Sequence, residues 1–277
     1  MRSAFSFMSS LASRAAHLTL VPSAALLLGL SGCASLDEDD ERLFSTTEAL
    51  SASLGGDGLD SLSAPDPAQA AADFSQAKAG DESCRTRTLD PSDPHVVHVT
   101  LNGCTKRFGR RVVDGKLTLT FSEGEAGALH IERVSEDLRI DGRPASLRAS
   151  TDLTFSGDSR TAQTQSTLTR TREDGSELVR SGSHTLTFDR GSLCRVLEGS
   201  STSTLDGEPL GNGRSELSWC ELEDGTELCP VGEVEHHRPA RGKHVLTRFD
   251  GSATAQAEVT TPRRSFTRTI PLSCQAQ

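Results

Sequence analysis

Aromatic side chains are scarce in this sequence, which has no tyrosine, one tryptophan and 4% aromatic residues in total. A transmembrane β-barrel needs an apolar outer face, with girdles of aromatic residues at both membrane interfaces. The chain instead carries Arg170, Arg172 and Arg180 near its middle. These features argue against a barrel that spans a membrane.

Apolar residues are also limited, at 34% of the chain, so any hydrophobic core must be thin. The run 161–167 is polar on both faces of any strand that contains it. We therefore expect part of a sheet to be solvated on both sides or to line a small polar interior.

Motifs for catalysis are missing as well. Residues 182–184, Gly-Ser-His, lack the Gly-x-Ser-x-Gly elbow of a serine nucleophile, and on a strand Ser183 and His184 would point apart. No glycine-rich loop enters a helix to hold a phosphate. We therefore expect no enzymatic activity and no cofactor.

Metal-binding patterns are equally weak. No cysteine and histidine spacing matches a structural zinc site, and the acidic stretch 221–227 lacks the ligands of a calcium-binding hand. His95 and His98 would point to opposite faces of a strand, as would the adjacent pair 236–237. His244 could join one member of that pair across a turn at 239–242, but we expect no metal site.

The N-terminus has the features of an export signal. Arg2 and Arg14 are the only charged residues before position 37, and the apolar run 24–30 is too short to span a bilayer as a helix. Leu30-Ser31-Gly32-Cys33 follows this run.

These four residues resemble the lipobox of bacterial lipoproteins. The resemblance implies that residues 1–32 are removed and that Cys33 carries diacylglycerol and an acylated amine, which together anchor a protein stably to a membrane. Ala34 and Ser35 follow without an aspartate, which resembles lipoproteins kept at the outer membrane. The alternative is an ordinary signal peptide followed by a chance cysteine.

The negative charge is concentrated next to this anchor. Residues 33–82 hold 12 acidic residues against Arg42 and Lys78, whereas residues 83–277 have a net charge of −2. We interpret 33–82 as a mostly disordered acidic spacer, with a cation-binding arm as the alternative. Nothing in the chain is basic enough to predict nucleic-acid binding.

One helix is predicted within this spacer, at 67–79. Asp66 can cap it, Pro67 suits its first turn, Gln69 fits a capping box and Gly80 can end it. Phe74 is its only large apolar residue, so we expect the helix to dock weakly or not at all.

From about His95 the sequence follows the two-residue period of β-strands, and we assign 83–277 to one β-meander domain. Leu-Thr-Phe recurs at 119–121, 153–155 and 186–188, and Leu-Ser-Trp follows at 217–219. Asp-Gly and other turn signals separate these runs about every 15–19 residues. The pattern predicts an all-β, up-and-down antiparallel meander of strands about 12–14 residues long, forming a twisted open sheet or half-barrel.

This body is similar in outline to uncharacterised secreted bacterial proteins and lipoproteins that have threonine-rich hairpins and an Asn-Gly-Cys-Thr motif, here 102–105. The resemblance covers about 95–277 and implies no known activity.

Six cysteines besides Cys33 predict disulfides in an exported protein. If Asp224-Gly225 is a two-residue turn, Cys220 faces Cys229 at a site without backbone hydrogen bonds, where side chains are closer. We therefore predict Cys220–Cys229, together with Cys84–Cys104 and Cys194–Cys274. A hairpin turning at Asp206-Gly207 would instead favour the rival pair Cys194–Cys220.

Two functional classes agree with these observations. The first is a lipid-anchored envelope protein with a structural or interaction role, whose partners are the membrane and an unknown protein or glycan. The second is a carrier for a small apolar ligand held in the curved sheet. The side chains expected to face such a ligand are Phe121, Phe155, Phe188 and Trp219.

Overall fold

The computed structural model describes residues 58–59, 61–77, 84–105, 112–172, 174–222, 226–272 and 274–277. One helix, α2 (Pro67–Gln76), precedes a sheet of thirteen strands in this part of the chain. The strands are β1 (Arg85–Leu89), β2 (Val96–Thr105), β3 (Val112–Glu123), β4 (Leu129–Ile140), β5 (Arg143–Ser156), β6 (Ser159–Thr171), β7 (Glu177–Asp189), β8 (Cys194–Leu205), β9 (Glu208–Cys220), β10 (Val231–Arg238), β11 (Lys243–Asp250), β12 (Thr254–Thr260) and β13 (Ser265–Pro271). Two short 3₁₀ turns lie at Glu125–Gly127 and Pro239–Arg241.

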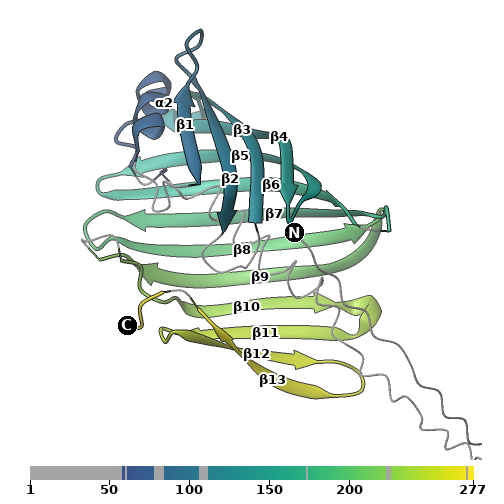
Figure 1. Cartoon of the computed structure of the whole chain (residues 1–277). Coiled ribbons are helices and arrows are strands. Elements are labelled where there is room, and N and C mark those ends of the chain that lie inside the picture. The colour runs from purple at the N-terminus through teal and green to yellow at the C-terminus, as the bar shows by residue number, and fades with distance from the viewer. Residues whose placement is uncertain are drawn as a thin grey trace, which may run out of the picture. The chain divides into compact units, whose positions relative to one another are not determined.

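The sheet confirms the predicted all-β antiparallel meander. Each strand pairs with its neighbours in sequence order, and β1 and β13 are the two edges, so the sheet is open. Strands β3–β9 have 12–14 residues, as predicted, whereas β10–β13 have only 7 or 8. Figure 1 shows β1–β4 running steeply across the direction of the later strands, which reflects the strong twist of the sheet.

Asp-Gly turns set the register of two long hairpins. Asp141-Gly142 and Asp206-Gly207 all have positive φ, the conformation that a tight two-residue hairpin requires. Each aspartate also accepts a hydrogen bond from the backbone at the start of the strand that lies next to its hairpin in the sheet, Val112 of β3 (3.0 Å) or Glu177 of β7 (2.7 Å). The turns therefore also tie neighbouring hairpins together.

Helix α2 is shorter than predicted but docks firmly. The Asp66 carboxylate accepts a hydrogen bond from the Gln69 amide (2.8 Å), as expected of the cap, and the helix ends at Gln76. The expectation of weak docking is wrong, because two small residues, Ala70 and Ala71, are fully buried and let the helix approach the sheet closely.

The contact is centred on Phe74, whose ring lies 5.8 Å from that of Phe121 on β3. The Arg87 guanidinium of β1 lies 4.3 Å from the centre of the Phe74 ring and donates to the carbonyl oxygens of Phe74 and Ala77 at the helix end. The apolar core extends from this helix over β2–β6. We call the face of the sheet that carries this core the inner face and the opposite one the outer face.

All six cysteines of 83–277 form disulfides, but only one of the predicted pairs is present. Cys84–Cys104 is confirmed, whereas the predictions Cys220–Cys229 and Cys194–Cys274 are wrong. The rival pair Cys194–Cys220 forms instead, because these residues are direct partners in the β8–β9 hairpin. The third bond, Cys229–Cys274, fixes the C-terminal segment beside the loop that follows β9.

A shift in strand register explains why the predicted pair Cys220–Cys229 does not form. Glu221 faces Glu227, which shifts the ladder by one residue from the register expected for a turn at Asp224-Gly225, a turn outside the described residues. Leu228 then lies opposite Cys220 and donates its amide to the Cys220 carbonyl (2.9 Å). A one-residue shift reverses the side to which each side chain points, so Cys229 turns away from Cys220.

The three disulfides are typical of a protein outside the cytoplasm. No helix among the described residues is long and apolar enough to cross a membrane. The proposed lipidation site, Cys33, lies outside the described residues, as does most of the spacer 33–82.

Candidate functional site

The inner face continues beyond the apolar core as a strongly cationic surface. Seven of its cationic side chains are each at most 8% exposed, and we call them the basic face: Arg133, Arg160, Arg170, Arg180, Arg195, Arg238 and Lys243. Their places in the strand register put all seven on the side that carries Leu153 and Leu168. The core residues lie on β2–β6, whereas the basic face extends to β11.

Acidic residues are almost excluded from this side of the sheet. Among the described strand positions that the register places on the inner face, only Glu123 and Glu208 are acidic, and both are exposed at strand ends. The outer face carries acidic residues on many strands, including Glu132, Asp152, Glu198, Glu216, Glu233 and Glu258. The net charge of 83–277 is therefore close to neutral although its positive and negative side chains are separated between the two faces.

Hydroxyl groups and carbonyl oxygens of the sheet contact several of these cations. Arg180 donates to the Ser201 hydroxyl on the next strand (2.7 Å), and Arg133 donates to the Thr151 hydroxyl. Arg160 donates to the carbonyl oxygens of Gly157 (2.7 Å) and Ser159 (2.9 Å). Burial without water lowers the pKa of Arg133 to about 10, so this guanidinium remains charged at neutral pH.

One row of the inner face alternates aromatic and arginine side chains. Phe155, Arg160, Phe188, Arg195 and Trp219 are successive register partners across β5–β9. Arg160 lies 4.8 Å from the ring centre of Phe155, and Arg195 lies 4.9 Å from that of Phe188. Stacking of this kind stabilises a guanidinium where water is scarce.

These contacts define the surroundings of the residues that we expected to face an apolar ligand. Phe121, Phe155, Phe188 and Trp219 do share the inner face. Phe74 covers Phe121, however, and arginines stack on Phe155 and Phe188. Trp219 is 7% exposed and lies opposite Arg195.

Two buried histidines lie among the arginines. Burial, followed by the charge of Arg180, lowers the pKa of His184 to about 4. Burial and the charges of Arg180, Arg238 and His244 hold the pKa of His236 well below its usual value. Both imidazoles are therefore neutral at pH 7, and the charge of the basic face comes from its arginines and its lysine.

Glycines on neighbouring strands make room for these imidazoles. Gly199 is the register partner of His184, and Gly213 is that of His236. A Cβ at Gly199 would overlap the His184 ring, and one at Gly213 would lie 2.7 Å from Nδ1 of His236. The two glycines are thus required by the space that the histidines occupy.

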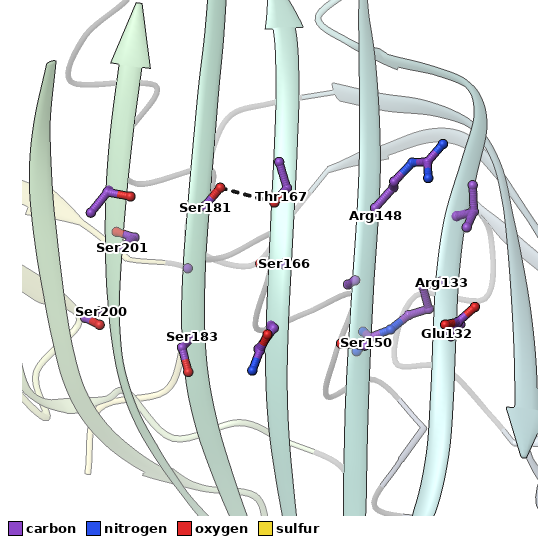
Figure 2. Close-up of a pocket in the computed structure, with 15 residues that line it drawn as sticks. Glu132, Arg133, Arg148, Ser150, Ser166, Thr167, Ser181, Ser183, Ser200 and Ser201 are labelled. Carbon is purple, nitrogen blue, oxygen red and sulfur yellow. Dashed lines mark hydrogen bonds between the residues drawn. The ribbon is translucent and has the colours of Figure 1, made fainter. Parts of the chain in front are cut away.

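The outer face has a shallow polar groove of about 570 Å³ over β4–β8 (Figure 2). Its floor consists mainly of hydroxyl and amide side chains, among them Ser150, Gln165, Thr167, Ser181, Ser183 and Ser200. Thr167 and Ser181 hydrogen-bond to each other across the β6–β7 pair (3.1 Å), while Glu132 and Arg148 mark the β4–β5 side. No aromatic side chain lines this groove, so a partner would be held by hydrogen bonds rather than by stacking.

The polar run 161–167 contributes to both surfaces. Gln165 and Thr167 line the outer groove, whereas Thr164 is buried and hydrogen-bonded to Thr151 (2.8 Å) on the inner face. From its sequence we expected this run either to be solvated on both sides or to line a small polar interior. The second expectation describes its inner side.

The histidines considered as metal ligands lie in separate places. His95 contacts Asp93 (3.1 Å), and His98 contacts Asp90 (2.9 Å). His237 and His244 are register partners with rings 6.2 Å apart, while His236 points to the inner face. No group of three potential metal ligands is found within the described residues.

No family model matches the chain, and neither a curated protein nor a solved structure matches it significantly. The fold and the two polar surfaces therefore carry the functional argument. Sequence reading had missed the basic face, although a signal was present: Arg160, Arg170 and Arg180 stand at positions that alternation assigns to the apolar side.

Proposed function

We propose that this chain is a lipid-anchored protein of the bacterial cell envelope, held by Cys33 at the outer membrane, with a structural or interaction role and no catalytic activity. The lipobox-like residues 30–33 and the three disulfides support this location. The Cys194–Cys220 bond joins β9 to β8, a strand that contributes to an extended polar surface, and such a surface suits contact with a large partner better than turnover of a small substrate.

The outer groove is the single observation that best supports an interaction role. It is open, polar and spread over five long strands, and the side chains on its floor offer both hydrogen-bond donors and acceptors. A protein loop or a glycan presents complementary groups and can follow such a surface. The packing of Phe74 on Phe121, and of arginines on Phe155 and Phe188, gives less support to a carrier of an apolar ligand.

The anchor is tested by globomycin, which blocks cleavage of lipoprotein precursors. We expect the wild-type precursor to accumulate, whereas a Cys33→Ser variant should take up no labelled palmitate and should fail to fractionate with the outer membrane. A mature wild-type chain that carries no lipid would refute the anchor.

The interaction role is tested in cells by a photo-cross-linking amino acid at Ser200 in the groove, with the same group at Gln256 on the outer face of β12 as a matched control. We expect one discrete adduct from position 200, to a protein or a glycan, and none from position 256. Equal labelling from both positions would show that the groove selects no partner.

A further inference from the structure

The open sheet has two edge strands, and they differ in what lies beside them. At the N-terminal edge, Arg87 of β1 donates hydrogen bonds to the carbonyl oxygens of Phe74 and Ala77, which hold helix α2 against the strand. At the C-terminal edge, β13 is the last strand in the sheet order, and β12 is the only described strand that pairs with it (Figure 1). An open edge presents a row of N–H and C=O groups that can pair with a strand of another chain.

Hydrogen bonds at the two ends of the β12–β13 ladder identify the backbone groups that face outward. The Thr261 amide donates to the Arg264 carbonyl, and the Leu272 amide donates to the Ala253 carbonyl (2.9 Å each). Since hydrogen-bonded and non-hydrogen-bonded pairs alternate along an antiparallel ladder, the even-numbered residues of β13 bond to β12 and the odd-numbered ones point away from it. The outward-pointing residues that have an N–H group are Ser265, Thr267 and Thr269.

Strand β13 has few of the features that protect natural sheet edges, which are usually very short, bulged or rich in lysine. It has seven residues in regular register with β12, contains no lysine and carries Arg268 as its only charged residue. Ile270, on the inner face, is 40% exposed. Pro271 stands at an outward-pointing position, so its missing N–H leaves the pairing with β12 intact. The strand can therefore accept a further strand along 265–269.

The edge is also held in place before any partner binds. Cys274, shortly after β13, forms a disulfide with Cys229 in the loop before β10. The Gln277 amide donates to the Gly251 carbonyl in the turn before β12 (2.9 Å). Binding to a preorganised strand costs less conformational entropy than binding to a mobile segment.

We propose that β13 pairs with β13 of a second copy of this chain, antiparallel and around a two-fold axis that passes through Thr267. In this register Thr267 faces Thr267 of the second copy, and Ser265 faces Thr269. Both pairs are of the hydrogen-bonded type, so each outward N–H group of 265–269 donates to a carbonyl oxygen of the other copy. The contact is closed because the same edge of each copy is used. It depends neither on the lipid at Cys33 nor on the outer groove.

The side chains on the inner face suit this register. Phe266 lies beside Arg268 of the second copy at a non-hydrogen-bonded pair, where side chains are close. Within the chain, Phe188 and Arg195 are direct register partners, and the guanidinium lies 4.9 Å from the ring centre. The two-fold axis creates two further pairs of this type.

Charge disfavours the two neighbouring registers. An axis at Phe266 would place Arg264 opposite Arg268 of the second copy, and an axis at Arg268 would place two Arg268 side chains opposite each other. Like charges directly opposite destabilise a strand pair. The axis at Thr267 instead places Arg268 opposite Phe266 and Arg264 opposite Ile270, so no two arginines face each other.

Cysteine cross-linking tests the register directly. Every protein is the full chain with Cys33→Ser, and the six cysteines of 83–277 are already in disulfides. The Cα atoms of a hydrogen-bonded pair lie about 5.5 Å apart, within the range of a disulfide. Under mild oxidation, Thr267→Cys should therefore give about tenfold more covalent dimer than Gln256→Cys, the matched control on the outer face of β12. Differently tagged Ser265→Cys and Thr269→Cys chains should cross-link to each other but not to themselves.

A proline variant tests the role of the backbone. Thr267→Pro removes one outward N–H group, whereas Thr267→Ala keeps it and controls for loss of the side chain. Because the Thr267 amide does not bond to β12, both variants should keep the wild-type midpoint of urea unfolding. By sedimentation we expect the dissociation constant of the dimer to rise about tenfold for Thr267→Pro and to stay within about twofold for Thr267→Ala. If Thr267→Pro loses stability, the cross-linking result decides.

Four results would overturn the proposal. Equal amounts of dimer from Thr267→Cys and Gln256→Cys would show that β13 does not pair with itself at this axis. A cross-link between Ser265→Cys and Thr267→Cys chains would place the axis elsewhere. An unchanged dissociation constant in a stable Thr267→Pro variant would show that the edge backbone is not used. Adducts of Thr267→Cys with a different protein in cells, without the dimer, would show that another chain occupies the edge.

Discussion

Replacing Phe74 by alanine tests whether helix α2 belongs to the folding unit of the sheet. Phe74 is 5% exposed, packs on Phe121 and lies under the guanidinium of Arg87. Burial of a phenylalanine contributes about 1.5–3 kcal/mol, an aromatic pair about 0.5–1.5 kcal/mol, and a cation–π contact about 0.5–2 kcal/mol. We therefore expect a loss of about 3–5 kcal/mol in the free energy of unfolding, the range measured for buried phenylalanines.

The assay is urea unfolding of residues 33–277, with Cys33→Ser in every protein to exclude the proposed lipid. Phe266→Ala on edge strand β13 is the matched control, since this ring also contacts an arginine (Arg264, 5.1 Å) but is less buried. The control should lose less than about 1.5 kcal/mol. The docking argument fails if Phe74→Ala loses no more than the control. It also fails if hydrogen exchange shows only residues 67–76 becoming unprotected while the sheet keeps its stability.

Three further predictions follow from the sheet. A non-reduced digest should yield peptides joined through Cys194–Cys220 and Cys229–Cys274, and a Cys220–Cys229 peptide would contradict the structure. The Cys194→Ala/Cys220→Ala double variant should lose roughly 3–4 kcal/mol in the free energy of unfolding, because the bond closes a loop of 26 residues. Gly199→Ala should lose about 1–3 kcal/mol in urea unfolding through overlap with His184, and adding His184→Ala should restore part of that loss; equal losses in the single and double variants would show that the imidazole is not the cause. The pKa of His184 is about 4 in the folded state and near 6.5 in the unfolded state, so its contribution to stability is complete above pH 6.5 and declines as pH falls toward 4. A His184→Gln variant should therefore lose less stability than the wild type between pH 7 and pH 5. Parallel curves of stability against pH would contradict the burial of a neutral imidazole.

Local pattern predicted the sheet well because each hairpin is specified by residues close in sequence. The alternation in β5 and β7, together with the Asp-Gly turns at 141–142 and 206–207, determines which residues pair and which face they occupy. Register errors appeared where this local information ended. Between β9 and β10 a one-residue shift moved Cys229 away from Cys220, and two disulfide predictions failed together.

The docking of α2 was missed for a different reason. Its sequence has one large apolar residue, and the energy of docking depends on what that residue meets. Phe121 and Arg87 are distant in sequence from one another and provide the contact only after the sheet has twisted. The basic face was missed for a similar reason. One arginine at a strand position that alternation assigns to the apolar side is not recognised as unusual by itself. It becomes so only when several strands place such arginines side by side.

The sequence alone determined the all-β class, the strand order and most strand positions, since these depend on neighbouring residues and on period-two alternation. The tertiary structure decided the disulfide partners, the docked helix and the separation of charge between two faces. These properties depend on which strand positions become neighbours across the sheet, and no single segment of the chain contains that information.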